Sequence, residues 1–185
     1  MAYRIIFLGG LLFILAGQIL LAQGNEFVYS QQPIDFAHWL ILSGSVLLIP
    51  QTVTFPPKIY SYIGIPLSLA GIACVIGMCV LDIIWWSFPS EEARMIFTDH
   101  ISKVPSIWKP FITIGPSSRV FNLGLFILSL NYVDQKKSGV AVVFLATLVL
   151  LHLIPVPYRL INGYLLTLTG FSIIFLSKSS KAEMA

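Results

Sequence analysis

The chain has 185 residues, of which 57% are hydrophobic and only 10% are charged, and its mean hydropathy is +0.88. Roughly a quarter of the residues in soluble domains are charged, so this composition excludes an ordinary soluble domain and indicates an integral membrane protein. The net charge of +3 includes no long run of Lys or Arg, so nucleic acid is not an expected partner. The expected partners are the lipid bilayer and other membrane-protein subunits.

Apolar stretches of about 20 residues, the length that crosses a bilayer, recur along the chain. The six expected spans are residues 4–22, 35–50, 59–86, 112–131, 138–155 and 158–177. The first stretch also has features of a secretory signal, but its apolar run is long for one, and we expect it to remain as an uncleaved helix. The sequence therefore predicts an all-α fold, a polytopic integral membrane protein with a single transmembrane domain over residues 1–185.

Residues 87–111 form the long connection between the third and fourth expected spans. Pro89 and Ser90 open a helical pattern there, and apolar residues then recur every three or four positions as far as Val104. Such a pattern is typical of an amphipathic helix that lies on the membrane surface. The segment is therefore expected to cover one face of the bundle.

The basic residues indicate how the spans are oriented. With the N-terminus in the cytoplasm, six alternating spans place on the cytoplasmic side Arg4, Lys58, Lys136, Lys137, Lys178 and Lys181. The opposite side then holds Arg94, Lys103, Lys109, Arg119 and Arg159. Short loops carry the orientation signal, and in them only Arg159 opposes the cytoplasmic group. Both termini are therefore expected in the cytoplasm.

Several ionisable residues of the expected spans fall near the same membrane face. Because consecutive helices alternate in direction, similar depths are expected for His38, Asp82, Arg119, His152 and Arg159. Charged groups inside a bilayer are costly unless they are paired or hydrated, so they normally face the bundle interior or a wet cavity. Asp82 and Arg119 flank the long connection and can neutralise each other. This non-cytoplasmic face is the predicted location of a functional site.

The three histidines of the chain all fall on this face. Together with one carboxylate they offer a zinc site with a position for activated water, and the residues concerned are His38, His100, His152 and either Asp82 or Asp99. The carboxylate would then act as the general base. Two of the histidines can instead ligate a haem. No H-x-x-x-H or H-E-x-x-H motif places two ligands on one helical face.

Other residues of this face suit membrane headgroups. The expected ligand-binding residues are Arg119, Arg159, Trp85 and Trp86, and either arginine can hold an anionic headgroup. The alternative is an interfacial belt, because amphipathic side chains such as those of Trp85 and Trp86 favour headgroup depth. The expected function is non-catalytic: an accessory subunit of a larger assembly, or a small binding or transport module whose polar, histidine-bearing face contacts a partner, lipid or solute. The alternative is a zinc-dependent integral-membrane hydrolase that acts on a lipid-like substrate.

Short similarities relate the two halves of the chain. The segment "RIIFLG" from Arg4 is similar to "RVFNLG" from Arg119, and "LIP" at Leu48 recurs at Leu153. Three spans in each half would make the second half inverted relative to the first, a 3+3 arrangement that many transporters use. Chance similarity between two apolar segments is the other explanation.

Small and amide residues inside the expected spans are explained first by helix packing. Glycines such as Gly17 and Gly71 allow two helices to approach closely, and the amide side chains of Gln18, Asn122 and Asn131 can form hydrogen bonds between helices. We therefore expect these residues to hold the bundle together rather than to bind a ligand.

Overall fold

The computed structural model describes residues 1–31, 34–115 and 119–177, and every regular element in those ranges is helical. The elements are α1 (Ala2–Leu21), α2 (Asn25–Ser30), α3 (Phe36–Thr52), α4 (Ile59–Ser87), α5 (Glu91–Ser102), α6 (Pro105–Ile107), the π-helix η1 (Trp108–Ile114), α7 (Arg119–Ser129), the 3-10 helix η2 (Leu130–Tyr132), α8 (Lys137–Leu150) and α9 (Arg159–Leu176). The predicted all-α fold is confirmed. Within the described ranges α1, α4 and α9 are each long and apolar enough to cross a membrane, whereas α3 and α8 are shorter apolar helices.

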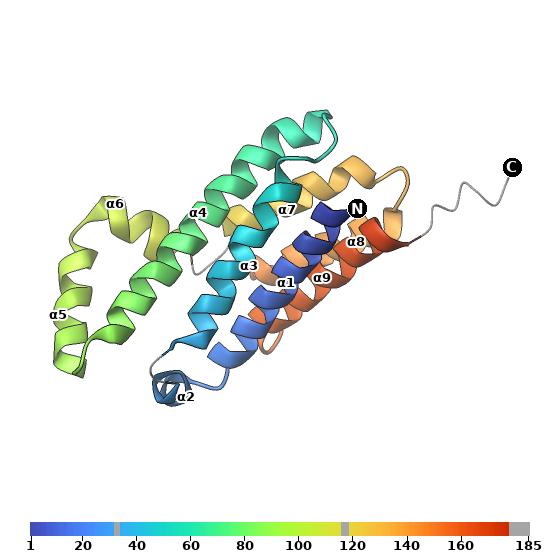
Figure 1. The fold of residues 1–185 in the computed structure, drawn as a ribbon. Coiled ribbons are helices and arrows are strands. Elements are labelled where there is room, and N and C mark those ends of the chain that lie inside the picture. The colour runs from blue at the N-terminus through green and yellow to red at the C-terminus, as the bar shows by residue number, and fades with distance from the viewer. Residues whose placement is uncertain (32–33, 116–118, 178–185) are drawn as a thin grey trace, which may run out of the picture.

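The six main helices pack in the order of the sequence (Figure 1). Helix α1 packs against α3, α3 against α4, α4 against α7, α7 against α8 and α8 against α9, and α9 returns to α1. Glycines allow two of these contacts, because a Cβ atom on Gly10 would lie 2.7 Å from the Gly44 carbonyl oxygen of α3. A Cβ atom on Gly71 of α4 would lie 2.4 Å from the Phe121 nitrogen of α7. Close approach at small residues is typical of helices that pack in membranes.

The end of the bundle that holds the N-terminus is closed by aromatic side chains. The ring of Phe7 on α1 meets the rings of Phe171 and Phe175 on α9 edge to face, with centroids 5.0 and 5.7 Å apart. Phe55, from the connection between α3 and α4, packs against the same group. Each such pair contributes about 0.5–1.5 kcal/mol beyond the burial of its area. Packed aromatic rings therefore fill this end of the bundle, and the predicted site residues lie toward the other end.

The fourth expected span, residues 112–131, is not a single straight helix. The helical segments 105–114 and 119–132 reach the length of a span only together, and they are inclined to each other by 57°. Gly115 lies directly after η1, and a Cβ atom there would approach the Cys74 carbonyl oxygen of α4 to 2.7 Å. The lack of a side chain lets the end of η1 lie against α4, which a continuous apolar pattern does not reveal.

The fifth expected span, residues 138–155, is also shorter than predicted, because α8 ends at Leu150. His152 has a left-handed backbone with φ of 64°. The backbone N–H groups of His152 and Leu153 donate to carbonyl oxygens in the last turn of α8 at 3.1 and 2.9 Å. These two bonds form a Schellman motif, which terminates the helix. His152 therefore lies in the turn after α8 and not within a helix that continues to residue 155.

The similar segments of the two halves do not occupy equivalent structure. Leu48 lies within α3, whereas Leu153 lies in the turn that follows α8. A Cβ atom on Gly9, in the first segment, would meet no atom within 4 Å, but one on its counterpart Gly124 would lie 2.6 Å from the Ser68 nitrogen. The similarity therefore gives no support to an inverted repeat.

Helix α5 confirms the helical pattern predicted after Ser90. The Ser90 hydroxyl oxygen accepts a hydrogen bond from the Ala93 backbone N–H at 3.2 Å and so caps the helix, which ends at Ser102. Ile101 is 7% exposed and faces the bundle, whereas Ile96 is 64% exposed. In Figure 1, α2 and α5 lie away from the N-terminus and from the last turn of α9. The position of α5 on a membrane surface stays a prediction.

Candidate functional site

The site begins at Asp35, which also begins helix α3. Its Oδ1 atom accepts a hydrogen bond from the His38 backbone N–H at 3.1 Å, as the side chain of an N-cap residue does. Its Oδ2 atom lies 2.6 Å from Nδ1 of the His38 ring. Because the Asp35 side chain is only 1% exposed, one buried carboxylate both starts the helix and orients the imidazole.

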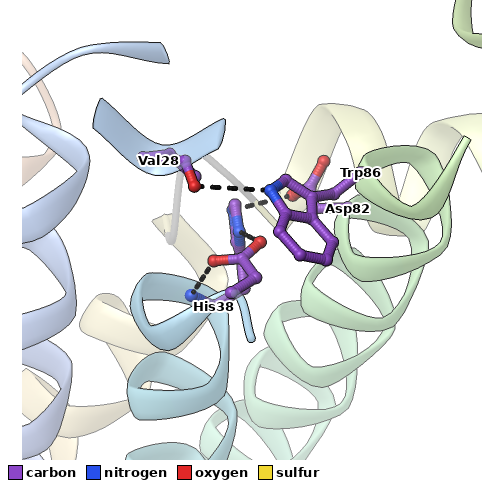
Figure 2. A network of polar contacts seen from close by, with 5 residues as sticks. Val28, His38, Asp82 and Trp86 are labelled. Atoms are coloured by element: carbon purple, nitrogen blue, oxygen red, sulfur yellow. Dashed lines mark hydrogen bonds and ion pairs between the residues drawn. The ribbon is translucent and has the colours of Figure 1, made fainter. Parts of the chain in front are cut away.

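The imidazole of His38 joins α3 to α4. Its Nε2 atom lies 3.4 Å from Oδ2 of Asp82. Figure 2 shows the two side chains between α3 and α4. With Nδ1–H donating to Asp35, Nε2 and the Asp82 carboxylate form a hydrogen bond only when a proton lies between them. Asp35, His38 and Asp82 are called here the Asp–His–Asp cluster. Two carboxylates and one imidazolium sum to a charge of −1, and loss of the proton makes it −2.

The pairing predicted between Asp82 and Arg119 is replaced by the pair between Asp82 and His38. Arg119 is the first residue of α7 and is exposed. It begins the second of two helical segments that are inclined by 57°, where the apolar pattern predicts one continuous helix. The convergence of His38 and Asp82 at one bundle end was nevertheless expected from the alternating directions of α3 and α4.

Helix α2 covers the Asp–His–Asp cluster and is held there by aromatic residues. The Trp86 Nε1–H donates to the Val28 carbonyl oxygen at 3.3 Å (Figure 2). The Tyr29 and Trp85 ring centroids lie 5.7 Å apart, and the Arg94 guanidinium of α5 lies 4.7 and 5.5 Å from them. Burial raises the pKa of the Tyr29 hydroxyl although the charge of Arg94 opposes the shift, so the phenol stays neutral. These contacts fix α2, α4 and α5 around the cluster.

Three cavities adjoin the cluster. The inner cavity, about 170 Å³, lies between α1, α3, α4 and α9, and its walls include Gln18, His38 and Asp82. The α2 cavity, about 200 Å³, is lined by all three cluster residues and by Trp85 and Trp86. The α5 cavity, about 320 Å³, is mostly apolar and also includes Asp82. Asp82 therefore lines all three.

Arg159 and His152 meet at another cavity of the same bundle end. Both line a volume of about 320 Å³ formed by the turn before α9. The Arg159 Nη1–H donates to the Leu150 carbonyl oxygen at 2.9 Å and holds the start of α9 against the end of α8. Arg119 is close enough for its charge to repel that of Arg159. The two arginines predicted to hold an anion therefore lie near each other.

The three histidines are not gathered at one point. His38 belongs to the cluster, His152 to the turn after α8 and His100 to the exposed side of α5. Asp99 pairs with Lys103 at 2.6 Å on α5, where both side chains are exposed. Among the described residues no group of three or more His, Cys, Asp or Glu side chains is arranged to hold a metal ion. Both ring nitrogens of His38 face carboxylates, so the geometry does not support the zinc or haem arrangement considered from the sequence.

Two residues of the site were not assigned to it by the sequence analysis. An Asp three positions before His38, at the start of an apolar run, is a helix N-cap signal that would have identified Asp35. Gln18 was expected to bond between helices, as Asn131 does when it donates to the Ser61 hydroxyl oxygen at 3.0 Å. Gln18 is instead 9% exposed and lines the inner cavity, and its side chain makes no hydrogen bond within the described part of the chain.

The chain matches no protein-family model, and neither the curated proteins nor the solved structures contain a significant match. The described residues define an all-helical protein with three apolar helices of membrane-spanning length and a polar cluster toward one end of the bundle. Its function is therefore inferred from that cluster and its cavities.

Proposed function

We propose that the protein is a non-catalytic, multi-pass membrane protein that binds an ammonium-bearing ligand at the Asp–His–Asp cluster. The observation that carries the proposal is the position of Asp82, which belongs to a cluster of net negative charge and lines three cavities. A carboxylate that has lost most of its water gains most from a charged donor. The indole rings of Trp85 and Trp86 add walls that favour a cation.

The same proposal includes six spans, with both termini in the cytoplasm. Support comes from the three helices of span length and from the way α3, α7 and α8 pack between them in the order of the chain. The cluster then lies near the non-cytoplasmic face, with α5 on the membrane surface and exposed apolar side chains in contact with lipid. A site of this kind suits a small binding or transport module, and equally an accessory subunit that presents its ligand to a larger membrane complex.

Asp82→Asn tests the ammonium site by isothermal titration of the protein in lipid nanodiscs. The probe is n-butylammonium, and n-butanol is its uncharged counterpart. A hydrogen bond between charged groups contributes about 1.5–3 kcal/mol, so Asp82→Asn should weaken butylammonium binding about tenfold or more. Butanol binding should not change, and Asp82→Glu, which keeps the charge, should retain most of the butylammonium affinity.

Asp99→Asn is the matched control, because Asp99 also carries a carboxylate but is exposed and paired with Lys103 on α5. This variant should bind butylammonium as the unaltered protein does. Equal losses of affinity in Asp82→Asn and Asp99→Asn would contradict the proposal, as would a protein that binds butanol as tightly as butylammonium.

A further inference from the structure

The inner cavity continues toward Arg159. A neighbouring outer cavity of about 340 Å³ includes the Arg159 side chain in its walls. The inner and outer cavities share Gln18, Leu21 and Leu160. The two cavities therefore adjoin at these residues of α1 and α9, with Asp82 in the walls of the inner cavity and Arg159 in the walls of the outer one.

Gln18 is the polar member of this shared wall. Gln18 is 9% exposed, and its carboxamide makes no hydrogen bond with any of the described residues. The carboxamide lines both cavities, so it is available to hydrogen-bond whatever occupies them. A carboxamide has two N–H donors and an acceptor oxygen, so it can contact both ends of a ligand that carries opposite charges. An amide at this position therefore suits a polar ligand that occupies both cavities.

Arg159 supplies positive charge on the side opposite the cluster. A guanidinium carries five N–H donors, and the one hydrogen bond seen for Arg159 among the described residues goes to the Leu150 carbonyl oxygen. Arg119 brings a second positive charge close by. Two like charges held near each other favour an anion between them, and the fork of a guanidinium matches the oxygen atoms of a phosphate.

We propose that the ligand is the zwitterionic headgroup of a membrane lipid, with its ammonium at Asp82, its phosphate at Arg159 and hydrogen bonds to Gln18 between them. This inference rests on the proposed function, which supplies only the ammonium half. A lipid is favoured over a free headgroup because α1 and α9 leave the site with exposed apolar side chains. Ile19 is 43% exposed and Leu165 is 48% exposed, so acyl chains can lie along these helices.

The test measures lipid binding to the detergent-solubilised protein by native mass spectrometry. The two probes are dioleoylphosphatidylethanolamine, which has both charges, and dioleoylphosphatidylglycerol, which has the phosphate without the ammonium. The first should bind about tenfold more tightly, the difference that one charged hydrogen bond provides. In Arg159→Gln, the ratio of phosphatidylethanolamine affinity to butylammonium affinity should fall about tenfold. Gln18→Leu should lower the same ratio by a smaller factor.

Lys103→Gln is the control for charge, because it removes an exposed cation from α5 and should leave that ratio unchanged. Equal affinity for the two lipids, or an unaltered ratio in Arg159→Gln, overturns the zwitterion proposal and leaves the ammonium site standing. Failure of the unaltered protein to bind butylammonium is instead a failure of the proposed function. Because Arg159 also holds the end of α8, Gln18→Leu provides the same comparison if Arg159→Gln does not fold.

The source of the headgroup is tested with sn-glycero-3-phosphoethanolamine, which carries both charges and no acyl chains. Binding about tenfold weaker than that of the lipid supports a lipid ligand, because burial of even two methylene groups accounts for such a difference. Equal affinity overturns the assignment to a lipid.

Discussion

The Asp35 carboxylate holds two groups of one residue, the backbone N–H and the ring Nδ1 of His38. The first bond caps α3 and is typically worth about 1 kcal/mol. The second fixes which ring nitrogen faces Asp82, because Nδ1 must carry the proton that Asp35 accepts. The residue that starts the helix therefore also orients the site, and the imidazole is in place before any ligand arrives.

His152 provides a stability prediction at the same scale. Its left-handed backbone, with φ of 64°, is strained for any residue with a Cβ atom. His152→Gly should relieve about 1–2 kcal/mol of that strain and lose about 0.5–1 kcal/mol to the greater freedom of glycine in the unfolded chain. We expect a net gain of about 0.5–1 kcal/mol in the free energy of unfolding, measured in mixed micelles. His152→Ala, which keeps the strain, should change stability by less, and a loss of stability in His152→Gly would refute this explanation.

The residues of the site differ in how far the sequence predicts them. His38 and Asp82 could be brought together from the alternating directions of consecutive helices. Asp35 can be identified from the sequence only as a helix N-cap, because it directly precedes an apolar run. Gln18 could not be separated from Asn131 by sequence, because both are amides inside apolar runs. Only the packed structure shows that Asn131 donates to the Ser61 hydroxyl and that Gln18 has no side-chain hydrogen bond to any of the described residues.

Helices α1 and α3 approach each other closely beside the site. A Cβ atom on Gly17, the neighbour of Gln18, would lie 2.5 Å from the Ile41 Cγ1 atom and 2.7 Å from the Ala37 carbonyl oxygen. The inner cavity also includes Gln18 and Ile41 among its walls. The distance between these two helices therefore sets the width of the cavity, and glycine at this position keeps the helices together.

Gly17→Ala should separate α1 from α3 at this point. Overpacking of a tight contact costs about 1–3 kcal/mol, and the backbone oxygen of Ala37 cannot move aside as a flexible side chain does. Gly9→Ala is the matched control on the same helix, because its Cβ atom would meet no atom within 4 Å. The control should be neutral or stabilising, since alanine favours a helix over glycine by about 1 kcal/mol. The two variants are compared by their midpoint temperatures of thermal unfolding. Equal changes in that temperature would contradict the close contact at Gly17.

The limits of the helices show which elements the sequence predicts well. The helix after Ser90 could be predicted because its cap and its spacing are both local signals. The breaks in the helices expected over 112–131 and 138–155 have no such local signal in the sequence. The sequence alone does not show the role of Gly115, because that role depends on its distance from α4. The left-handed position of a Schellman motif is usually a glycine, and here it is His152.

The whole bundle is a closed ring in which α9 returns to α1. Short connections predict that consecutive helices are neighbours, but they do not predict which helix closes the ring. Closure matters for the site, because Gln18 comes from α1 and Leu160 from α9, so the first and last helices both contribute to the walls of the inner and outer cavities. The linked cavities therefore exist only in the complete fold.

Orientation in the membrane is tested by labelling single cysteines in intact cells with a membrane-impermeant maleimide. The background is Cys74→Ala with Cys79→Ala, and the two positions are Lys103 on α5 and Asp134 before α8, both exposed. Lys103→Cys should react from outside and Asp134→Cys only after the cells are opened, because positive short loops stay in the cytoplasm. Lys178 and Lys181, which also support this orientation, lie outside the described residues. Labelling of both positions from the same side would reject the six-span arrangement.

Trp86 also gives the protein an intrinsic optical reporter. Its indole donates to the Val28 carbonyl oxygen and lies over the cavity beneath α2. If α2 lifts, the indole meets water and its fluorescence moves to longer wavelength. In a variant whose other three tryptophans are replaced by phenylalanine, the emission wavelength of Trp86 would then report any movement of α2 away from the cavity. No attached dye is needed.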